Sequence, residues 1–187
     1  MKQIIKNTAI LLAITAVAAV ALAFVYELTR KPIALAEQQA RAEAYQAVYE
    51  DVSFMDVEDA AATLKAYNAT LTDGTVINEL LSADKAVGDR AGYVLSVSAK
   101  GYGGPVTIAL GIDTSGIVVG YAVLSHSETP GFGANCENAD VKAQFPGISS
   151  ADELDGITGA TITTTALKNA TRAALALVQE IEGVQVG

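Results

Sequence analysis

The chain is poor in the residues that most often bind metals. Its 187 residues include one cysteine and one histidine. A single cysteine excludes an internal disulfide and any zinc or iron–sulfur site built from several cysteines of this chain. A single histidine likewise excludes a multi-histidine metal cluster. A redox role would therefore need a cofactor held by other kinds of residue.

Positive charge is also scarce. Lysine and arginine number 12 against 21 acidic residues, which gives a net charge of −9 at pH 7. This balance excludes a nucleic-acid partner, which needs a basic surface, and docking of the soluble part on anionic lipid. Charged residues make up 18% of the chain, below the roughly 25% usual for soluble domains. The deficit indicates a segment that lies in lipid.

A long apolar run occupies residues 7–26. Only Asn7, Thr8 and Thr15 are polar there, and Glu27 is the first acid. A helix of that length spans about 30 Å, the thickness of the hydrocarbon core of a bilayer. We therefore predict a short cytoplasmic N-terminus at residues 1–6, followed by a transmembrane helix at 7–26 in contact with membrane lipid.

Two other interpretations of this run stay open. Residues 21–23 and 34–36 both read Ala-Leu-Ala and resemble signal-peptide cleavage sites, although the run exceeds the usual 7–15-residue signal core. A pilin-like helix is the second, although the acid expected early in such a run is missing. Lys2 and Lys6 precede the run and basic residues 30–31 follow it, so the positive-inside rule gives only a slight lean to a cytoplasmic N-terminus.

Residues 27–52 are predicted to form a stalk helix. Pro32 is acceptable in the first turn of a second helix, and residues 34–50 are rich in alanine, glutamate and glutamine, which favour helix. Residues at helical spacing would dock this helix on the domain formed by residues 53–187: Ala42, Tyr45, Val48 or Tyr49, and Val52.

The domain is predicted to be α+β, an antiparallel sheet flanked by helices. Apolar and polar residues alternate over 93–98 and 106–113, and residues 113–116 read as a hairpin turn. Residues 117–125 are almost continuously apolar, which predicts a strand at the centre of the sheet. A last helix, ending at Gly183, would bury one face: Leu167, Ala170, Ala174, Val178 and Ile181.

Two segments could carry chemistry. Residues 126–133 follow the predicted central strand, and loops at strand ends often carry function. Residues 155–165, rich in threonine, precede the last helix, whose N-terminus favours an anion such as phosphate. Gly159 and Ala160 would let a ligand come close. The alternatives are a plain Pro-Gly turn with a solvated Glu128, and threonines that cap a helix.

The second segment resembles a flavinylation motif. Residues 158–163 read Thr-Gly-Ala-Thr-Ile-Thr with Asp155 three residues earlier, and they match Asp-x-x-(Ser/Thr)-Gly-Ala-(Ser/Thr)-x-(Ser/Thr). Residues 126–133 resemble the same family's second signature, and 101–105 also fit its pattern. With its N-terminal span, the chain resembles the G subunit of the Rnf complex, an ion-pumping ferredoxin:NAD oxidoreductase. The C subunit of the sodium-pumping NADH:quinone reductase shares both motifs.

The resemblance implies where a flavin is held. Thr163 would carry FMN through a phosphoester bond, made by a separate flavin transferase, and would be a modification acceptor rather than a catalytic residue. The remaining residues expected at the cofactor are Glu128, Thr129, Gly131, Gly133, Asp155, Thr158, Gly159, Ala160 and Thr161.

The resemblance also implies a place in an assembly. The chain would relay electrons among the other membrane subunits of an Rnf-type complex, with residues 27–187 outside the cytoplasm and no activity of its own. One alternative keeps the flavin, in a quinone reductase or a stand-alone extracytoplasmic electron carrier. The other is a pilin-like anchored module with no flavin.

Overall fold

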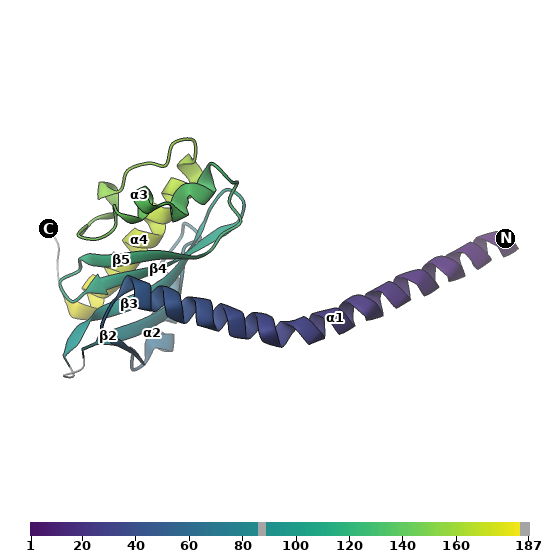
Figure 1. The fold of residues 1–187 in the computed structure, drawn as a ribbon, viewed down its shortest axis with the longest axis horizontal. Coiled ribbons are helices and arrows are strands. Elements are labelled where there is room, and N and C mark those ends of the chain that lie inside the picture. The colour runs from purple at the N-terminus through teal and green to yellow at the C-terminus, as the bar shows by residue number, and fades with distance from the viewer. Residues whose placement is uncertain (86–88, 184–187) are drawn as a thin grey trace. The chain divides into compact units, whose positions relative to one another are not determined.

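The computed structural model describes residues 1–85 and 89–183. Along the chain the elements are α1 (Lys2–Val48), β1 (Ser53–Asp56), α2 (Ala60–Asn68), β2 (Val76–Asp84), β3 (Arg90–Lys100), β4 (Pro105–Asp113), β5 (Val118–Ser125), α3 (Ala139–Lys142) and α4 (Thr161–Glu182), with short 3₁₀ turns η1 (Gly133–Glu137) and η2 (Ala151–Glu153) (Figure 1). The chain divides into two units, Met1–Ala40 and Arg41–Gly187.

The first unit consists of α1 up to Ala40. By length and composition, α1 can cross a membrane, and its large apolar side chains, such as Leu11, Val17 and Phe24, are exposed. Pro32 lies inside α1, so the prediction of a second helix that begins there is wrong. A proline removes one backbone hydrogen bond, but the helix continues through it because the flanking residues favour helix. The span at 7–26 stays a prediction.

The second unit is built on a five-stranded antiparallel sheet with strand order β1-β2-β3-β4-β5. The predicted α+β class and antiparallel meander are confirmed. The central position predicted for residues 117–125 is wrong, because β5 lies at an edge. Its apolar pattern has another cause: backbone hydrogen bonds join Val118 to Gly147 and Ile148, and Tyr121 stacks on Phe145 with ring centroids 3.8 Å apart.

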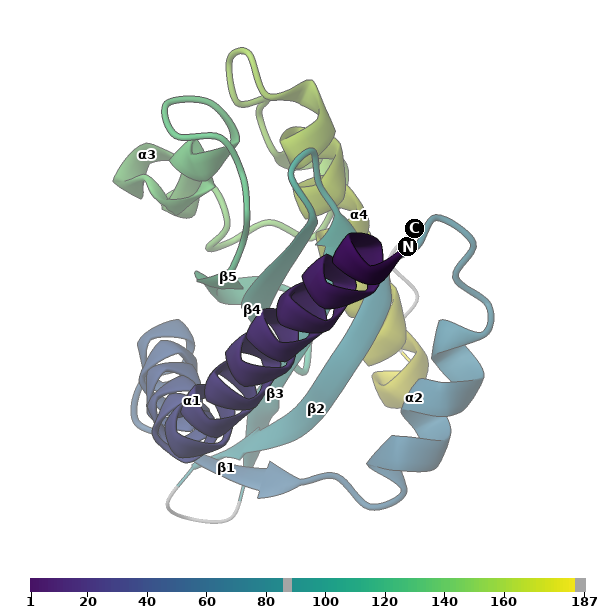
Figure 2. The same cartoon turned by 90° about the vertical axis from the view of Figure 1, so that its right-hand side faces the viewer.

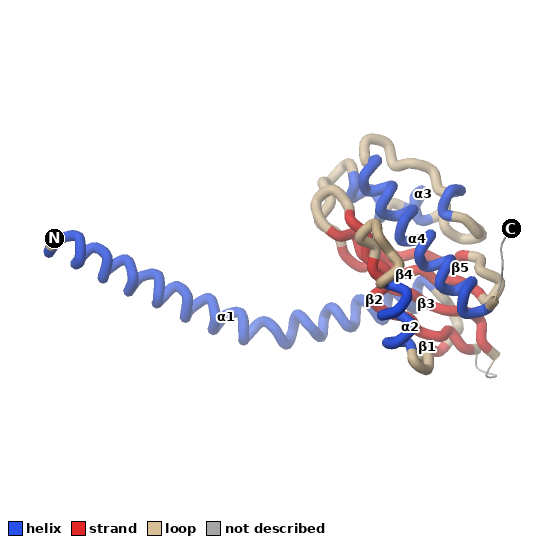
Figure 3. Tube along the Cα trace, turned by 180° about the vertical axis from the view of Figure 1, so that it is seen from behind, coloured by secondary structure: helices blue, strands red, loops and turns tan. Residues whose placement is uncertain are grey.

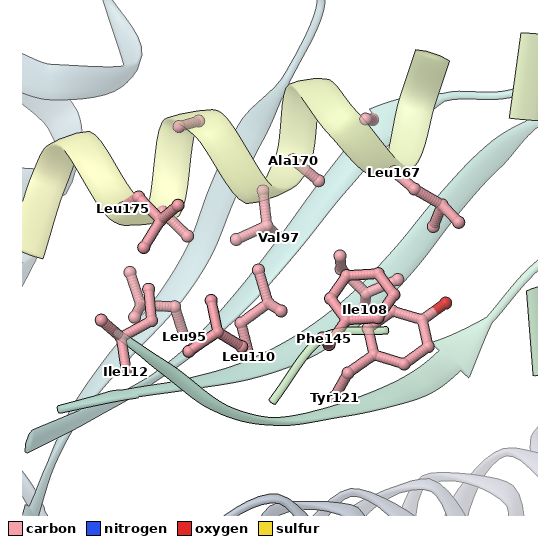
Figure 4. Packing of buried hydrophobic residues seen from close by; sticks show 14 of the residues in the cluster. Leu95, Val97, Ile108, Leu110, Ile112, Tyr121, Phe145, Leu167, Ala170 and Leu175 are labelled. Carbon is pink, nitrogen blue, oxygen red and sulfur yellow. The ribbon is translucent and has the colours of Figure 1, made fainter. Parts of the chain in front are cut away.

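Helix α4 covers one face of the sheet (Figure 3). In Figure 4, its Leu175, Ala170 and Leu167 lie along the side of the helix that is turned toward the strands. Leu175 lies toward Leu95 and Leu167 toward Ile108, and all of these residues are buried. The predicted helix face is confirmed, and α4 ends at Gly183, whose φ of 67° is left-handed. Helix α2 lies beside β2 (Figure 2) and reaches α4 through a hydrogen bond. This hydrogen bond joins α2 to the middle of α4, at the Ala173 carbonyl.

The last turns of α1, from Arg41 on, pack on the other face of the sheet. Tyr45 and Val48 are buried against Val94 and Ala109, and the Tyr45 hydroxyl donates to Glu79 Oε2 at 2.5 Å. Gly120 of β5 lies against the backbone of Val48, where a Cβ would overlap it. The expected docking of Tyr45 and Val48 on the domain is therefore confirmed.

Candidate functional site

A pocket of about 450 Å³ lies at the N-terminal end of α4. Its size is in the range of roughly 300–1,000 Å³ typical of small-molecule sites. Three segments form it: the glycine-rich turn after β3, the loop after β5, and the first turn of α4. The lining residues are Tyr102, Glu128, Thr129, Phe132, Gly133, Gly159, Ala160, Thr161, Ile162 and Thr163.

A buried hydroxyl and a buried carboxylate meet at the wall of this pocket. Thr163 Oγ1 donates a hydrogen bond to Glu128 Oε2 at 2.5 Å, and the two residues are 1% and 6% exposed. The other carboxylate oxygen, Oε1, accepts from the backbone N–H of Gly103 at 2.9 Å. Both oxygens of Glu128 are thus held, one by α4 and one by the turn after β3.

Glycines make room for this contact. A Cβ on Gly133 would lie 2.5 Å from Thr163 Oγ1 and would overlap Glu128 Oε2. A Cβ on Gly101 would overlap Glu128 Oε1. The two glycines therefore admit the carboxylate between the loops, which no larger residue would allow without displacing it.

His126 fixes the backbone of the loop. Its Nδ1 accepts a hydrogen bond from the N–H of Glu128 at 3.0 Å, and its Nε2 lies 3.2 Å from Glu137 Oε1. Because Nδ1 accepts a hydrogen bond, the ring proton is on Nε2, which donates a hydrogen bond to Glu137. His126 therefore positions the backbone of Glu128, and it is not among the residues that line the pocket.

The first turn of α4 presents backbone donors to the pocket. Its N-cap is Ala160, without a side-chain cap, so the alternative in which threonines cap this helix is wrong. Thr164 instead donates to the Ala160 carbonyl at 3.0 Å and accepts from the Ile157 N–H at 2.9 Å. The first N–H groups of a helix lack intrahelical partners and attract anions. The pocket lining contains no lysine or arginine, so these groups are its main donors.

Comparison with known proteins finds one family model that matches the N-terminal part of the chain and another that matches the C-terminal part. Family models match at residues 1–48, the RnfG N-terminal region, and at residues 101–176, the FMN-binding domain. The G subunit of the ion-translocating oxidoreductase complex of Stutzerimonas stutzeri is 31% identical over 169 residues, which cover 82% of this chain and 72% of that protein. The chain belongs to the RnfG family.

Other proteins are similar at lower identity. The G subunit of the Na⁺-translocating ferredoxin:NAD⁺ oxidoreductase complex of Acetobacterium woodii is 29% identical over 203 residues, covering 96% of this chain and 94% of that protein. Among solved structures, Shewanella oneidensis NqrC matches with a TM-score of 0.47 and 16% identity, over 55% of this chain and 58% of that one. The FMN-binding domain match includes all three segments that line the pocket.

In this member of the RnfG family, the pocket brings together the predicted site residues except Gly131, Asp155 and Thr158. Gly131 has a φ of 79° in the turn before η1, and Thr158 is exposed. Asp155 is exposed too, and its N–H donates to Gln144 Oε1 at 2.8 Å. In the structure, these three residues lie in the loops around the pocket rather than in its wall.

Sequence reasoning missed three pocket residues with large apolar surfaces. Tyr102, Phe132 and Ile162 are 72%, 55% and 50% exposed. Phe132 packs close to Gly159, where a Cβ would lie 3.1 Å from Phe132 Cδ1 and where the φ of 76° also favours glycine. Tyr102 and Phe132 could have been found from the sequence, because each is a large apolar residue in a glycine-rich turn. A turn that only faces solvent has no need of such a side chain.

The single cysteine lies behind the loop rather than in the pocket. Cys136 is fully buried, and burial raises the pKa of its thiol to about 11. The thiol is therefore protonated at neutral pH and a poor nucleophile or ligand. Within residues 1–85 and 89–183, no group of three or more His, Cys, Asp or Glu is arranged to hold a metal ion.

Proposed function

We propose that the chain is the FMN-carrying component of a membrane-bound, ion-translocating ferredoxin:NAD oxidoreductase complex, with FMN bound to Thr163 through a phosphoester. The observation that carries the proposal is the place of Thr163. It is the last hydroxyl of the motif at residues 155–163, and it lies in the wall of a pocket at the start of a helix. The Acetobacterium woodii relative is a subunit of a Na⁺-translocating ferredoxin:NAD⁺ oxidoreductase complex, which supports the assignment to such a complex.

The residues present fit both ends of the cofactor. Next to Thr163, the uncapped start of α4 offers N–H groups to a phosphoryl group, and Gly159 lets it approach. Farther out, Tyr102, Phe132 and Ile162 offer the exposed aromatic and apolar surface that a flat flavin ring requires. Thr129, exposed at the rim, adds a hydroxyl.

Bound FMN would supply one- and two-electron transfer, chemistry that the amino acids of this chain lack. The chain's own part is to hold the cofactor and to exclude water from its attachment point. The partners are the other membrane subunits of the complex, between which electrons pass, and a flavin transferase that makes the bond. Ferredoxin and NAD would bind to those other subunits, so this chain has no activity alone.

The same proposal sets the topology. Residues 7–26 span the membrane in contact with lipid, and residues 27–187 lie outside the cytoplasm. A covalent link is useful there, because a cofactor that dissociated from an extracytoplasmic domain would be lost. The exposed apolar surface of α1 supports the span.

The test is the intact mass of full-length protein produced with and without a flavin transferase. The wild type should gain the mass of one FMN only with the transferase, and Thr163→Ala should fold without gaining it. Thr165→Ala is the matched control, since Thr165 is exposed and its hydroxyl donates to the Thr161 carbonyl. A wild type that stays colourless and unmodified would remove the flavin from the proposal. A mass gain in Thr163→Ala would move the attachment to another residue.

A further inference from the structure

The hydroxyl of Thr163 has a different kind of hydrogen-bond partner from those of three other threonines in α4. Thr164, Thr165 and Thr171 each donate to the carbonyl four residues earlier, the usual bond of a threonine in a helix. Thr163 donates instead to a carboxylate 35 residues away in sequence. Its proton is thus already directed at a group that can accept it.

We propose that Glu128 is the general base of flavin attachment, accepting the proton of Thr163 when its oxygen is esterified. This inference rests on the proposed function, since it assumes that Thr163 is the attachment residue. Glu128 accepts a hydrogen bond from the reacting oxygen directly, which is the contact that a general base requires.

The surroundings of Glu128 favour this role over a purely structural one. The carboxylate is 6% exposed and is held by the Gly103 N–H on its far oxygen, while His126 holds its backbone. Among the residues that line the pocket it is the sole carboxylate. Thr163 is 1% exposed, so a phosphoryl donor reaches its oxygen from the pocket side, with Glu128 already in contact.

The step balances with an activated donor. A hydroxyl cannot form a phosphoester from a free phosphate without a leaving group, so the donor must be a flavin nucleotide with a phosphoanhydride bond. The bond between Thr163 Oγ1 and phosphorus forms, and the phosphoanhydride P–O bond breaks. The departing nucleotide phosphate takes the electron pair, and the proton of Oγ1 passes to Glu128 Oε2.

The experiment measures the rate of flavin incorporation into full-length protein purified without flavin. A purified flavin transferase, FAD and Mg²⁺ are added, and in-gel fluorescence and intact mass follow the product. Glu128→Gln keeps the shape of the side chain and removes its basicity, so its rate should fall at least 100-fold. Asp140→Asn is the matched control: it changes an exposed carboxylate in α3, outside the pocket lining, and its rate should stay within threefold.

A second variant separates basicity from shape. Glu128→Asp fits the site less well than glutamine but restores a carboxylate, so it should react at least tenfold faster than Glu128→Gln. A structural role predicts the reverse order. The inference is overturned if Glu128→Gln reacts within tenfold of wild type, or if Glu128→Asp is no faster than Glu128→Gln.

Two outcomes need separate controls. If Glu128→Gln does not fold by circular dichroism, Gly101→Ala takes its place, because a Cβ there overlaps Glu128 Oε1, the carboxylate oxygen that does not bond to Thr163, and so displaces the carboxylate without changing its chemistry. A tenfold slower rate supports the inference and a wild-type rate overturns it. If wild type itself gains no flavin, the proposed function fails, which is distinguishable from a failure confined to the Glu128 variants.

Discussion

Gly133→Ala tests the geometry on which the site depends. The added Cβ would lie 2.5 Å from Thr163 Oγ1 and 2.9 Å from Glu128 Cβ, and it would overlap Glu128 Oε2. Thr163 is anchored in α4, so the Glu128 side chain must swing away or the loop must shift. Swinging away breaks the bond from the Thr163 hydroxyl to a charged acceptor, which costs about 1.5–3 kcal/mol.

Shifting the loop costs a similar amount, because overpacking in a filled interior destabilises by about 1–3 kcal/mol. Replacing glycine by alanine also restricts the unfolded chain, which returns about 0.4–1 kcal/mol. The net loss in the free energy of unfolding is therefore about 1–2 kcal/mol. For a domain of this size, each kcal/mol lowers the melting temperature by about 2–4 °C.

Thermal unfolding of the full-length protein in detergent, followed by circular dichroism, measures this loss. Gly156→Ala is the matched control, since a Cβ there meets nothing within 4 Å and its φ is not left-handed. That control should melt at or slightly above the wild-type temperature. If Gly133→Ala melts with Gly156→Ala, the close contact of Glu128 with Thr163 is refuted, and the role inferred for Glu128 loses its basis.

Two further predictions concern the rest of the chain. Gly120→Ala would press a Cβ against backbone atoms of Val48, which cannot rotate away, so it should destabilise by about 1–3 kcal/mol. Proteolysis at residues 41–52 should quicken with it, and an unchanged cleavage rate would contradict the docking of α1 on the sheet. Alkaline phosphatase fused after Gly187 should be active and a fluorescent protein there dark, and the opposite pattern would overturn the proposed topology.

The sequence predicted helix α4 well because its pattern is local. Alanine and leucine at helical spacing report one buried face, and Gly183 supplies the left-handed residue that ends it. The same reasoning failed for β5, since a continuous apolar run reports that both faces are covered but not what covers them. Here Phe145 covers one face of β5, the end of α1 covers the other at Gly120, and the backbone of residues 147–148 pairs with its edge.

The candidate site was likewise predictable from the sequence only in part. The sequence placed residues 155–165 just before the last helix, whereas α4 already begins at Thr161 and has Thr163 in its first turn. The contact between Thr163 and Glu128 was beyond sequence reasoning, because it depends on how two loops meet across the end of the sheet. The alternative of threonine capping is wrong for a related reason, because the Thr164 hydroxyl accepts from the Ile157 N–H of the preceding loop.

The proposed proton transfer to Glu128 also changes the charge of the site once FMN is attached to Thr163. A phosphoester on Thr163 would place an anion beside the Glu128 carboxylate, which contacts the same oxygen. Two like unit charges roughly 4 Å apart repel by about 4 kcal/mol at an effective dielectric constant of about 20. The start of α4 stabilises an anion by about 0.3–1 kcal/mol, up to about 2 in partly buried geometry. The described residues that line the pocket include no lysine or arginine to supply the difference. A proton left on Glu128 removes the repulsion and adds a hydrogen-bond donor facing the phosphoryl oxygens. The transfer of the Thr163 proton to Glu128 would therefore both activate the hydroxyl and leave the protonation state that the modified site requires.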